Sequence, residues 1–213
     1  MKKILYIDCF SGISGDMMVG ALLDAGLDFS LLRNELKKLN IDGYSVDCSK
    51  VIANSIKAKK FDVRVTVPQH KRDYKDIIKI IKSSNIDEGV RKISLDIFKI
   101  IAEAESKVHN CSIDRVHFHE VGAVDSIVDI VSTAICIKSL KSASFHCSKI
   151  PLGRGFVDTE SGRFPVPAPA TVEILKGLPV FGGNLDFEAT TPTGAAILKS
   201  VVSRIGQIPQ MVI

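Results

Sequence analysis

The chain has 213 residues, 46% of them hydrophobic, which is enough to bury a substantial core. Its 28 basic and 24 acidic residues are mixed along the sequence, so the net charge of +4 argues against a nucleic-acid-binding protein and remains compatible with a small anionic ligand. Five widely spaced cysteines without a C-x-x-C pair indicate reduced thiols in a cytoplasmic protein.

Hydrophobic periodicity predicts strands and helices that alternate along the first half of the chain. Apolar and polar residues alternate most clearly at 61–67, and helical spacing of apolar residues is longest at 90–108. The predicted elements are a strand at 4–8, a helix at 17–25 ended by Gly26, a helix at 31–39 with Asp28 or Ser30 as its N-cap, two antiparallel strands within 44–67 joined near Asn54, and helices at 77–81 and 90–108.

The stretch at 121–140 is long and apolar enough to be tested as a membrane span. Asp125 and Asp129 would each cost about 2.5–3.5 kcal/mol near the middle of a bilayer, so we predict a buried helix of a soluble protein instead. A strand near 143–150 follows, then a segment rich in glycine and proline that we interpret as a functional loop. The remaining predicted elements are helices at 171–176 and 194–205.

Residue types that bind metals gather before and within this helix. His117 and His119 are two residues apart, so in an extended segment both side chains project to one side, and Glu120 begins the turn. Asp125 and Asp129 are four apart and share one helix face. Imidazole and carboxylate together suit nickel, zinc, iron or manganese. Alternatively, the histidines are ordinary turn residues and the aspartates cap helices or pair with lysines, although unpaired buried carboxylates are costly.

The turn after the first strand, "CFSGISGD", is of a type that can hold a phosphate at a helix N-terminus. Its candidate phosphate-binding residues are Ser11, Gly12, Ser14 and Gly15. The pattern is neither a Walker loop nor G-x-G-x-x-G, so an ordinary strand-to-helix turn fits equally well.

Two later segments offer further candidate anion-binding groups. Arg154 and Arg163 are suited to clamp a carboxylate or phosphate, and Thr191 and Thr193 carry hydroxyls beside a helix start. The alternative is that the arginines are solvated and the threonines, with Pro192, only cap the helix. A nucleophilic active site has little support, because the sequence contains no G-x-S-x-G elbow.

Four runs in order, at 8–26, 116–131, 151–175 and 190–198, resemble the LarC family of nickel insertion proteins. Together they span most of the chain and are far more specific than any one run alone. The resemblance implies insertion of nickel into pyridinium-3,5-bisthiocarboxylic acid mononucleotide. The product is the nickel-pincer nucleotide, the cofactor of lactate racemase and related enzymes. This lyase-class reaction uses CTP with manganese or magnesium.

The resemblance also directs attention to particular residues. Within the matching run we infer, from the chemistry of the side chains, that His117, His119, Glu120, Asp125 and Asp129 handle the metal, with Asp8 and Asp16 as further candidates. A neighbouring carboxylate, Glu120 or Asp125, is suited to accept the ring proton that is lost when the nickel–carbon bond forms. The sequence departs from the family pattern where Ser161 replaces a common histidine, and where "QHKRDY" replaces a histidine-rich tract and leaves only His70. Both departures put in doubt any additional nickel-loading site.

These observations predict one α/β unit over residues 1–213, with a mixed sheet, flanking helices and a small antiparallel subdomain at 44–67. We expect it to be the N-terminal portion of a longer nickel insertase, without the C-terminal portion that handles CTP. The expected partners are the mononucleotide substrate and that C-terminal portion. We expect no nucleic acid and no membrane as partners, and a homo-oligomer is compatible with the sequence. Two alternative functions remain, a metal-dependent phosphohydrolase and a non-catalytic nickel storage or chaperone protein.

Overall fold

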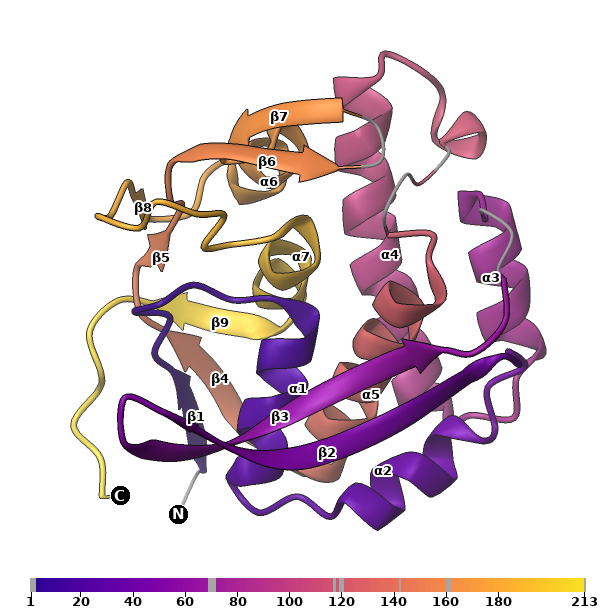
Figure 1. Cartoon of the computed structure of the whole chain (residues 1–213), viewed down its shortest axis with the longest axis horizontal. Helices are drawn as coiled ribbons and strands as arrows, with labels where there is room; N and C mark the ends of the chain where they lie inside the picture. The colour runs from indigo at the N-terminus through magenta and orange to yellow at the C-terminus, as the bar shows by residue number, and fades with distance from the viewer. Residues whose placement is uncertain are drawn as a thin grey trace.

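Helices, short parallel strands and antiparallel hairpins alternate along the chain (Figure 1), in a computed structural model that describes residues 3–68, 72–116, 118, 121–141, 143–159 and 162–212. The arrangement confirms the predicted α/β class. Its elements are β1 (Ile4–Ile7), α1 (Gly15–Asp24), α2 (Phe29–Leu36), β2 (Tyr44–Ala53), β3 (Ile56–Val65), α3 (Tyr74–Ser83), α4 (Glu88–Val108), the short 3-10 helix η1 (Ile113–Arg115), α5 (Val124–Ser139), β4 (Ser144–Cys147), β5 (Ile150–Pro151), β6 (Gly155–Thr159), β7 (Gly162–Val166), α6 (Pro169–Leu175), β8 (Val180–Phe181), α7 (Pro192–Val201) and β9 (Val202–Ile205).

Three short strands form a parallel sheet in the order β1-β4-β9, at the left of Figure 1. Ile7 pairs with Cys147, which pairs in turn with Ile205. The predicted helix at 194–205 is therefore too long, because α7 ends at Val201 and the next four residues form β9. β-Branched residues at 201 and 202 favour this change, and pairing with β4 satisfies the backbone of 202–205.

The longest helix, α4, packs against α3, α5, α6 and α7, whereas α1 and α2 pack against α5. Helix α5 is buried around most of its circumference, as its nearly continuous apolar sequence predicts. No helix among the described residues is long and apolar enough to cross a bilayer. Phe118 is also buried in this core, where its ring lies 6.2 Å from Tyr74 and 6.4 Å from Phe98 between centroids.

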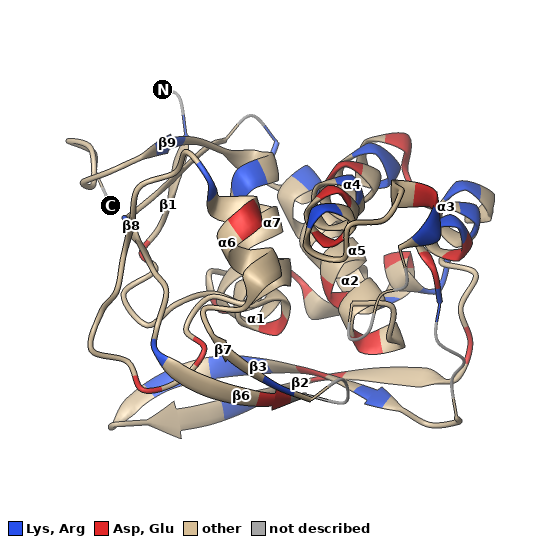
Figure 2. Cartoon of the chain, turned by 90° about the horizontal axis from the view of Figure 1, so that it is seen from above, with Lys and Arg blue, Asp and Glu red and all other residues tan. Residues whose placement is uncertain are grey.

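The predicted antiparallel pair at 44–67 is the long hairpin β2–β3, which Figure 2 shows as a layer along one side of the helices. Its turn is at Asn54 and Ser55, both in the left-handed region, with φ of 49° and 65°. The hairpin packs on α1 and α5 through β3, and its Phe61 is buried. Gly20 of α1 allows this approach, because a Cβ atom there would stand 2.8 Å from the Lys59 carbonyl oxygen.

The segment rich in glycine and proline at 151–170 contains more regular structure than we predicted from its composition. Strands β6 (Gly155–Thr159) and β7 (Gly162–Val166) pair antiparallel, and Val166 is joined to Pro167 by a cis peptide bond. Before it, β5 pairs in parallel with β8 and extends the fold beyond the end of β4. The segment is therefore a scaffold with a hairpin rather than one long irregular loop.

Candidate metal-binding pocket

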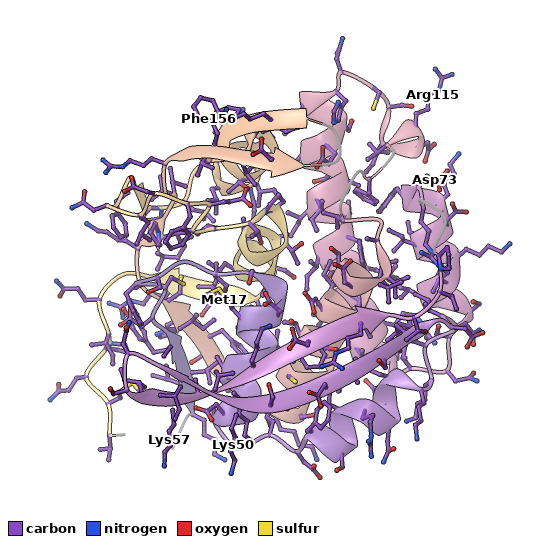
Figure 3. All side chains as sticks on the ribbon, viewed as in Figure 1. Met17, Lys50, Lys57, Asp73, Arg115 and Phe156 are labelled. Atoms are coloured by element: carbon purple, nitrogen blue, oxygen red, sulfur yellow. The ribbon has the colours of Figure 1, made fainter. Side chains whose placement is uncertain are left out.

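The N-terminal ends of α1, α5 and α7 surround a pocket of about 400 Å³. Met17, labelled in Figure 3, is in the first turn of α1 and directly follows the lining residue Asp16. The lining residues are Ser14, Gly15, Asp16, Val121, Ala123, Asp125, Ser126, Asp129, Glu188, Thr191, Pro192 and Thr193. The pocket thus brings together segments from the beginning, middle and end of the chain. A second pocket, of about 440 Å³ between α2 and β2, contains none of the predicted site residues.

The start of α1 forms one wall of the pocket. Ser14 caps the helix by accepting a hydrogen bond from the Met17 amide, and its hydroxyl also donates to Asp16 Oδ1. Gly15 is pressed against the opposite wall, since a Cβ atom there would lie 2.9 Å from Asp129 Oδ2 and 3.1 Å from Thr193 Cγ2. Only glycine allows α1 to approach α5 and α7 this closely.

Asp129 contributes a largely buried carboxylate to this pocket. Its pKa is raised from 3.8 to about 8, first by burial and then by the negative charges of Asp16 and Asp125, while a hydrogen bond from the Asp16 backbone amide opposes the shift. Its Oδ1 atom is buried and has no hydrogen-bond partner among the described residues. A buried acceptor without a partner is costly, and a bound cation would relieve that cost.

The N-terminal ends of α5 and α7 supply polar groups and a partial positive charge that favours nearby carboxylates. Asp125 lies exposed in the first turn of α5 and accepts a hydrogen bond of 2.8 Å from the Ser126 amide. Thr191 caps α7 by accepting from the Gly194 amide at 3.2 Å, and Thr193 is buried beside it. Each helix N-terminus carries a partial positive charge, which stabilises nearby carboxylates. The pocket can therefore concentrate acidic groups that would otherwise repel one another strongly.

The glycine turn before α1 is held by the protein itself. The Gly12 amide donates to the Cys9 carbonyl at 2.8 Å, and the Ile13 amide donates to the Ala189 carbonyl at 2.8 Å. Ser14 and Gly15 line the pocket, whereas Asp8, Ser11 and Gly12 are outside its described lining. The bonding of Gly12 and Ile13 favours a structural role for this part of the predicted phosphate-binding turn.

The two predicted arginines lie on the β5–β7 side, outside the described pocket lining. Arg154 pairs with Asp186, with its Nε atom 2.5 Å from Oδ1. Arg163 lies over the ring of Phe156, 4.7 Å from its centroid, and its Nε is 3.9 Å from Asp158. Figure 3 shows Phe156 on the β6–β7 hairpin. The structure thus does not bring these guanidinium groups together with Thr191 and Thr193.

Three predicted ligands, His117, His119 and Glu120, lie outside the described residues, as do His70 and Ser161. Of the residues that flank the three ligands, Phe118 is buried in the core and Val121 lines the pocket. Within the described part of the chain, no three His, Cys, Asp or Glu side chains are grouped closely enough to hold a metal ion. Asp16, Asp125 and Asp129 are therefore an incomplete ligand set on their own.

Glu188 is a pocket residue that the sequence analysis did not identify. It precedes the "ATTPTG" run and forms an isolated antiparallel bridge with Gly153. The only available signal was its closeness in sequence to Thr191, because a single glutamate in an irregular segment has no characteristic spacing. With Glu188 the lining contains four acidic side chains, so its negative charge disfavours a free anion and would attract a cation.

Comparison with known proteins gives a consistent result across the chain. The family model described as "Nickel insertion protein" matches residues 5–213. No solved structure matches. The relative from Geobacillus kaustophilus (strain HTA426), called "Pyridinium-3,5-bisthiocarboxylic acid mononucleotide nickel insertion protein", is 50% identical over 219 residues, which cover 98% of this chain and 53% of the relative.

Two further relatives carry the same name. The protein of Acetivibrio thermocellus is 45% identical and that of Staphylococcus epidermidis (strain ATCC 12228 / FDA PCI 1200) is 43% identical. The matches cover 99% and 100% of this chain, and 54% of each relative. The chain thus spans about half the length of the curated relatives it matches. Because the family model covers residues 5–213, the chain belongs to the nickel insertion protein family.

Proposed function

We propose that this chain is the nickel-holding part of an insertase that places nickel into pyridinium-3,5-bisthiocarboxylic acid mononucleotide. The observation that carries the proposal is the buried Oδ1 atom of Asp129, without a partner among the described residues, in a pocket shared with Asp16 and Asp125. Membership of the family and the printed names of the relatives support nickel as the ion. Nickel is here the cargo that is passed on, and not a resident cofactor.

In this proposal the pocket carboxylates share the ion with His117, His119 and Glu120. Their neighbour Val121 lines the pocket, which makes a ligand set of mixed imidazole and carboxylate groups reasonable. Such ligands hold nickel less tightly than sulfur donors do, so transfer to the thiocarboxylate sulfurs of the substrate is favourable. Asp8, which lies outside the described pocket lining, is not needed for this set.

Formation of a nickel–carbon bond releases one ring proton, and a carboxylate beside the ion is suited to accept it. We assign this role to Asp125 or Glu120. Asp125 is exposed in the first turn of α5, where a substrate ring can reach it, and it lines the same pocket as Asp129. Ser14, Gly15, Thr191 and Thr193 then form the wall that contacts the substrate.

The remaining elements of the reaction lie, in this proposal, outside the chain. CTP, with manganese or magnesium, is handled by the C-terminal portion of the longer protein. The product would serve as the cofactor of lactate racemase and related enzymes. As an enzyme that inserts nickel, the complete protein would belong to the lyase class.

A direct binding experiment tests the nickel-holding role. Isothermal titration of the purified chain with nickel chloride is expected to give one site, weakened at least about tenfold by Asp129→Asn and by His117→Ala. Asp47→Asn, on the solvent-exposed side of β2, is the matched control and is expected to bind as the wild type does. Equal binding by all four proteins would remove the pocket from the proposal.

A second experiment tests insertion itself. A chimera that joins this chain to the rest of the Geobacillus kaustophilus relative is incubated with nickel, magnesium, CTP and the bisthiocarboxylate mononucleotide. Mass spectrometry is expected to detect the nickel-containing product, and Asp125→Asn in the chimera is expected to lower its yield more than it lowers nickel affinity. Stoichiometric binding without product would favour a storage or chaperone protein, and release of phosphate by the chain alone would favour a phosphohydrolase.

A further inference from the structure

The hairpin β2–β3 has one covered edge and one open edge. Strand β3 packs on α1 so closely that a Cβ atom at Gly20 would stand 2.8 Å from the Lys59 carbonyl oxygen and 3.6 Å from the Phe61 amide nitrogen. Helix α1 therefore covers the backbone edge of β3, which Figure 1 shows between β2 and α1. Strand β2 pairs with β3 alone, so its other edge has no neighbouring strand among the described residues.

The backbone groups that point out of the open edge follow from the register of the hairpin. The Thr66 amide donates to the carbonyl of Gly43, the residue directly before β2. Because hydrogen-bonded and non-hydrogen-bonded pairs alternate along an antiparallel ladder, Tyr44, Val46 and Cys48 hold the non-bonded positions. Their N–H and C=O groups face away from β3, and nothing in the described part of the chain bonds to them. Such an unpaired row is a template for an added strand.

A pocket lies beside this open edge. It has a volume of about 440 Å³ and is placed between the last turn of α2 and the first three residues of β2. Its floor is apolar, because Leu36, Leu39 and Ile41 line it and are buried. The Tyr44 hydroxyl donates to the Leu36 carbonyl at 3.3 Å and ties the strand to the end of the helix. The pocket can thus take an apolar side chain next to the strand edge.

Three cations line or flank this pocket. Arg33 and Lys37 are four residues apart, so they share one face of α2, and both line the pocket. Lys50 lies farther along β2. All three side chains are exposed, and none of them forms an ion pair with a described residue. Asp42, an acidic residue of the lining, already has an interaction within the protein. The surface therefore attracts an acidic ligand.

We propose that β2 accepts an extended, acidic segment of a partner protein as a third strand, with an aliphatic side chain of that segment in the pocket beside α2. Main-chain hydrogen bonds to Tyr44, Val46 and Cys48 supply affinity. Alternate side chains of the segment enter the pocket, because successive residues of a strand point to opposite faces. Its acidic side chains meet Arg33 and Lys37.

A second copy of this chain fits the edge less well than an acidic partner does. Two copies that pair through β2 would bring their arginines and lysines together, and like charges across paired strands repel. The surface is also separate from the proposed nickel chemistry, because the pocket beside α2 shares no lining residue with the acidic pocket. The inference therefore goes beyond the proposed function and does not depend on it.

Selection from random peptides displayed on phage tests the surface without a presumed partner sequence. The whole chain is the bait, and enriched peptides are synthesised with a fluorescent label. The enriched peptides are expected to be acidic and to contain an aliphatic residue. Fluorescence anisotropy is expected to show binding that weakens as the salt concentration rises. Absence of enrichment, or enrichment of peptides that are not acidic, overturns the proposal.

A proline variant tests the strand edge. Val46→Pro removes an N–H that points away from β3, so the hairpin keeps its own hydrogen bonds while the proline ring blocks an added strand. It is expected to weaken binding of the selected peptide at least about tenfold. Val46→Ala keeps the amide and is expected to bind nearly as the wild type does, with circular dichroism as the check on folding. Equal binding by both variants overturns the proposal.

A double variant tests the cations. Arg33→Gln with Lys37→Gln is expected to weaken binding of the selected peptide about fivefold and to reduce its dependence on salt. Lys75→Gln with Lys79→Gln removes an exposed pair of the same spacing on α3 and is the matched control. An equal loss of affinity in both double variants would mean that only the overall charge matters, and would overturn the assigned surface.

Amide exchange measured by NMR on the wild type detects the added strand directly. Bound peptide is expected to slow exchange of the outward amides of Tyr44, Val46 and Cys48. The amides of Ser45 and Asp47 are bonded to β3 already and are expected to change little. A bound peptide without this alternating pattern overturns the proposal. Protection of the same amides in the chain alone, rising with its concentration, would show a second copy as the occupant and would overturn it as well.

Discussion

Gly15 and Asp129 are in such close contact that a Cβ atom on residue 15 would lie 2.8 Å from the Asp129 Cβ and 2.9 Å from its Oδ2. The first turn of α1 therefore packs directly on the middle of α5, at the floor of the acidic pocket. This contact makes the geometry of the pocket sensitive to a single methyl group.

Replacement of Gly15 by alanine tests that sensitivity. Gly15→Ala is expected to lower the free energy of unfolding by about 1–3 kcal/mol, because the added methyl group overpacks the contact with Asp129. It is also expected to weaken nickel binding. Urea unfolding and isothermal titration measure the two effects. Gly182→Ala is the matched control, since a Cβ atom there would meet nothing within 4 Å. Equal stability of both variants would mean that α1 and α5 are less tightly packed here.

The buried carboxyl of Asp129 makes the stability of the metal-free chain depend on pH. Its pKa is raised from 3.8 to about 8 in the folded chain, so between these values the folded chain holds a proton that the unfolded chain has released. The free energy of unfolding therefore falls as pH rises from about 4 to about 8, and then levels off.

Asp129→Asn removes this dependence. The variant is expected to match the wild type near pH 4 and to exceed its free energy of unfolding by on the order of 3 kcal/mol above pH 8, after a discount for partial exposure. Urea unfolding at pH 4, 6 and 8 measures the difference, with Asp47→Asn as control. A constant difference across this range would contradict the raised pKa.

Phe118 lies between the two predicted histidine ligands in the sequence, and its side chain is buried. Its ring is buried between Tyr74 and Phe98, so Phe118→Ala is expected to lower the free energy of unfolding by about 3–5 kcal/mol. Phe118→Leu retains most of the apolar volume and is expected to cost clearly less. If His117 and His119 hold nickel, Phe118→Leu will also weaken nickel binding at temperatures where the variant is fully folded, as circular dichroism can verify.

Thr191 contributes to stability as the N-cap of α7. Loss of its acceptor in Thr191→Ala is expected to cost about 1 kcal/mol, because the Gly194 amide loses its capping partner. Thr191→Ser keeps the hydroxyl oxygen and is expected to remain within a few tenths of a kcal/mol of the wild type. Thermal unfolding of the two variants side by side distinguishes capping from packing of the threonine methyl group.

Local patterns in the sequence were sufficient for most of the fold. The alternation at 61–67 predicted the hairpin β2–β3, and the spacing of four between Asp125 and Asp129 predicted a shared face, which both residues present to the pocket. Strand β9 was missed because residues 202–205 continue an apolar pattern that also suits a helix. Its state is decided by pairing with β4, a contact that no local window contains.

The candidate site was less accessible to prediction from sequence. Asp16 and Glu188 meet Asp129 only because α1 packs on α5 and the segment before α7 returns to both. In the same way, the sequence alone makes Arg154 a reasonable candidate to bind an anion. In the structure it pairs with Asp186, which lies more than thirty positions later in the chain. Long-range packing determines both the assembly of the acidic pocket and the pairing of Arg154. Neither can be predicted from composition or from the spacing of residues in the sequence.

The pocket joins residues 14–16, 121–129 and 188–193, which are far apart along the chain. A cation bound there would cross-link segments that are distant in the sequence. It would bind the folded chain and have little affinity for the unfolded chain, in which these segments are apart. At a hundredfold excess over its Kd, such an ion adds about 2.7 kcal/mol to the free energy of unfolding. The cation-bound chain would thus resist heat and proteolysis better than the empty chain. A molecule that begins to unfold at the pocket would release its cation before the rest of the chain unfolds.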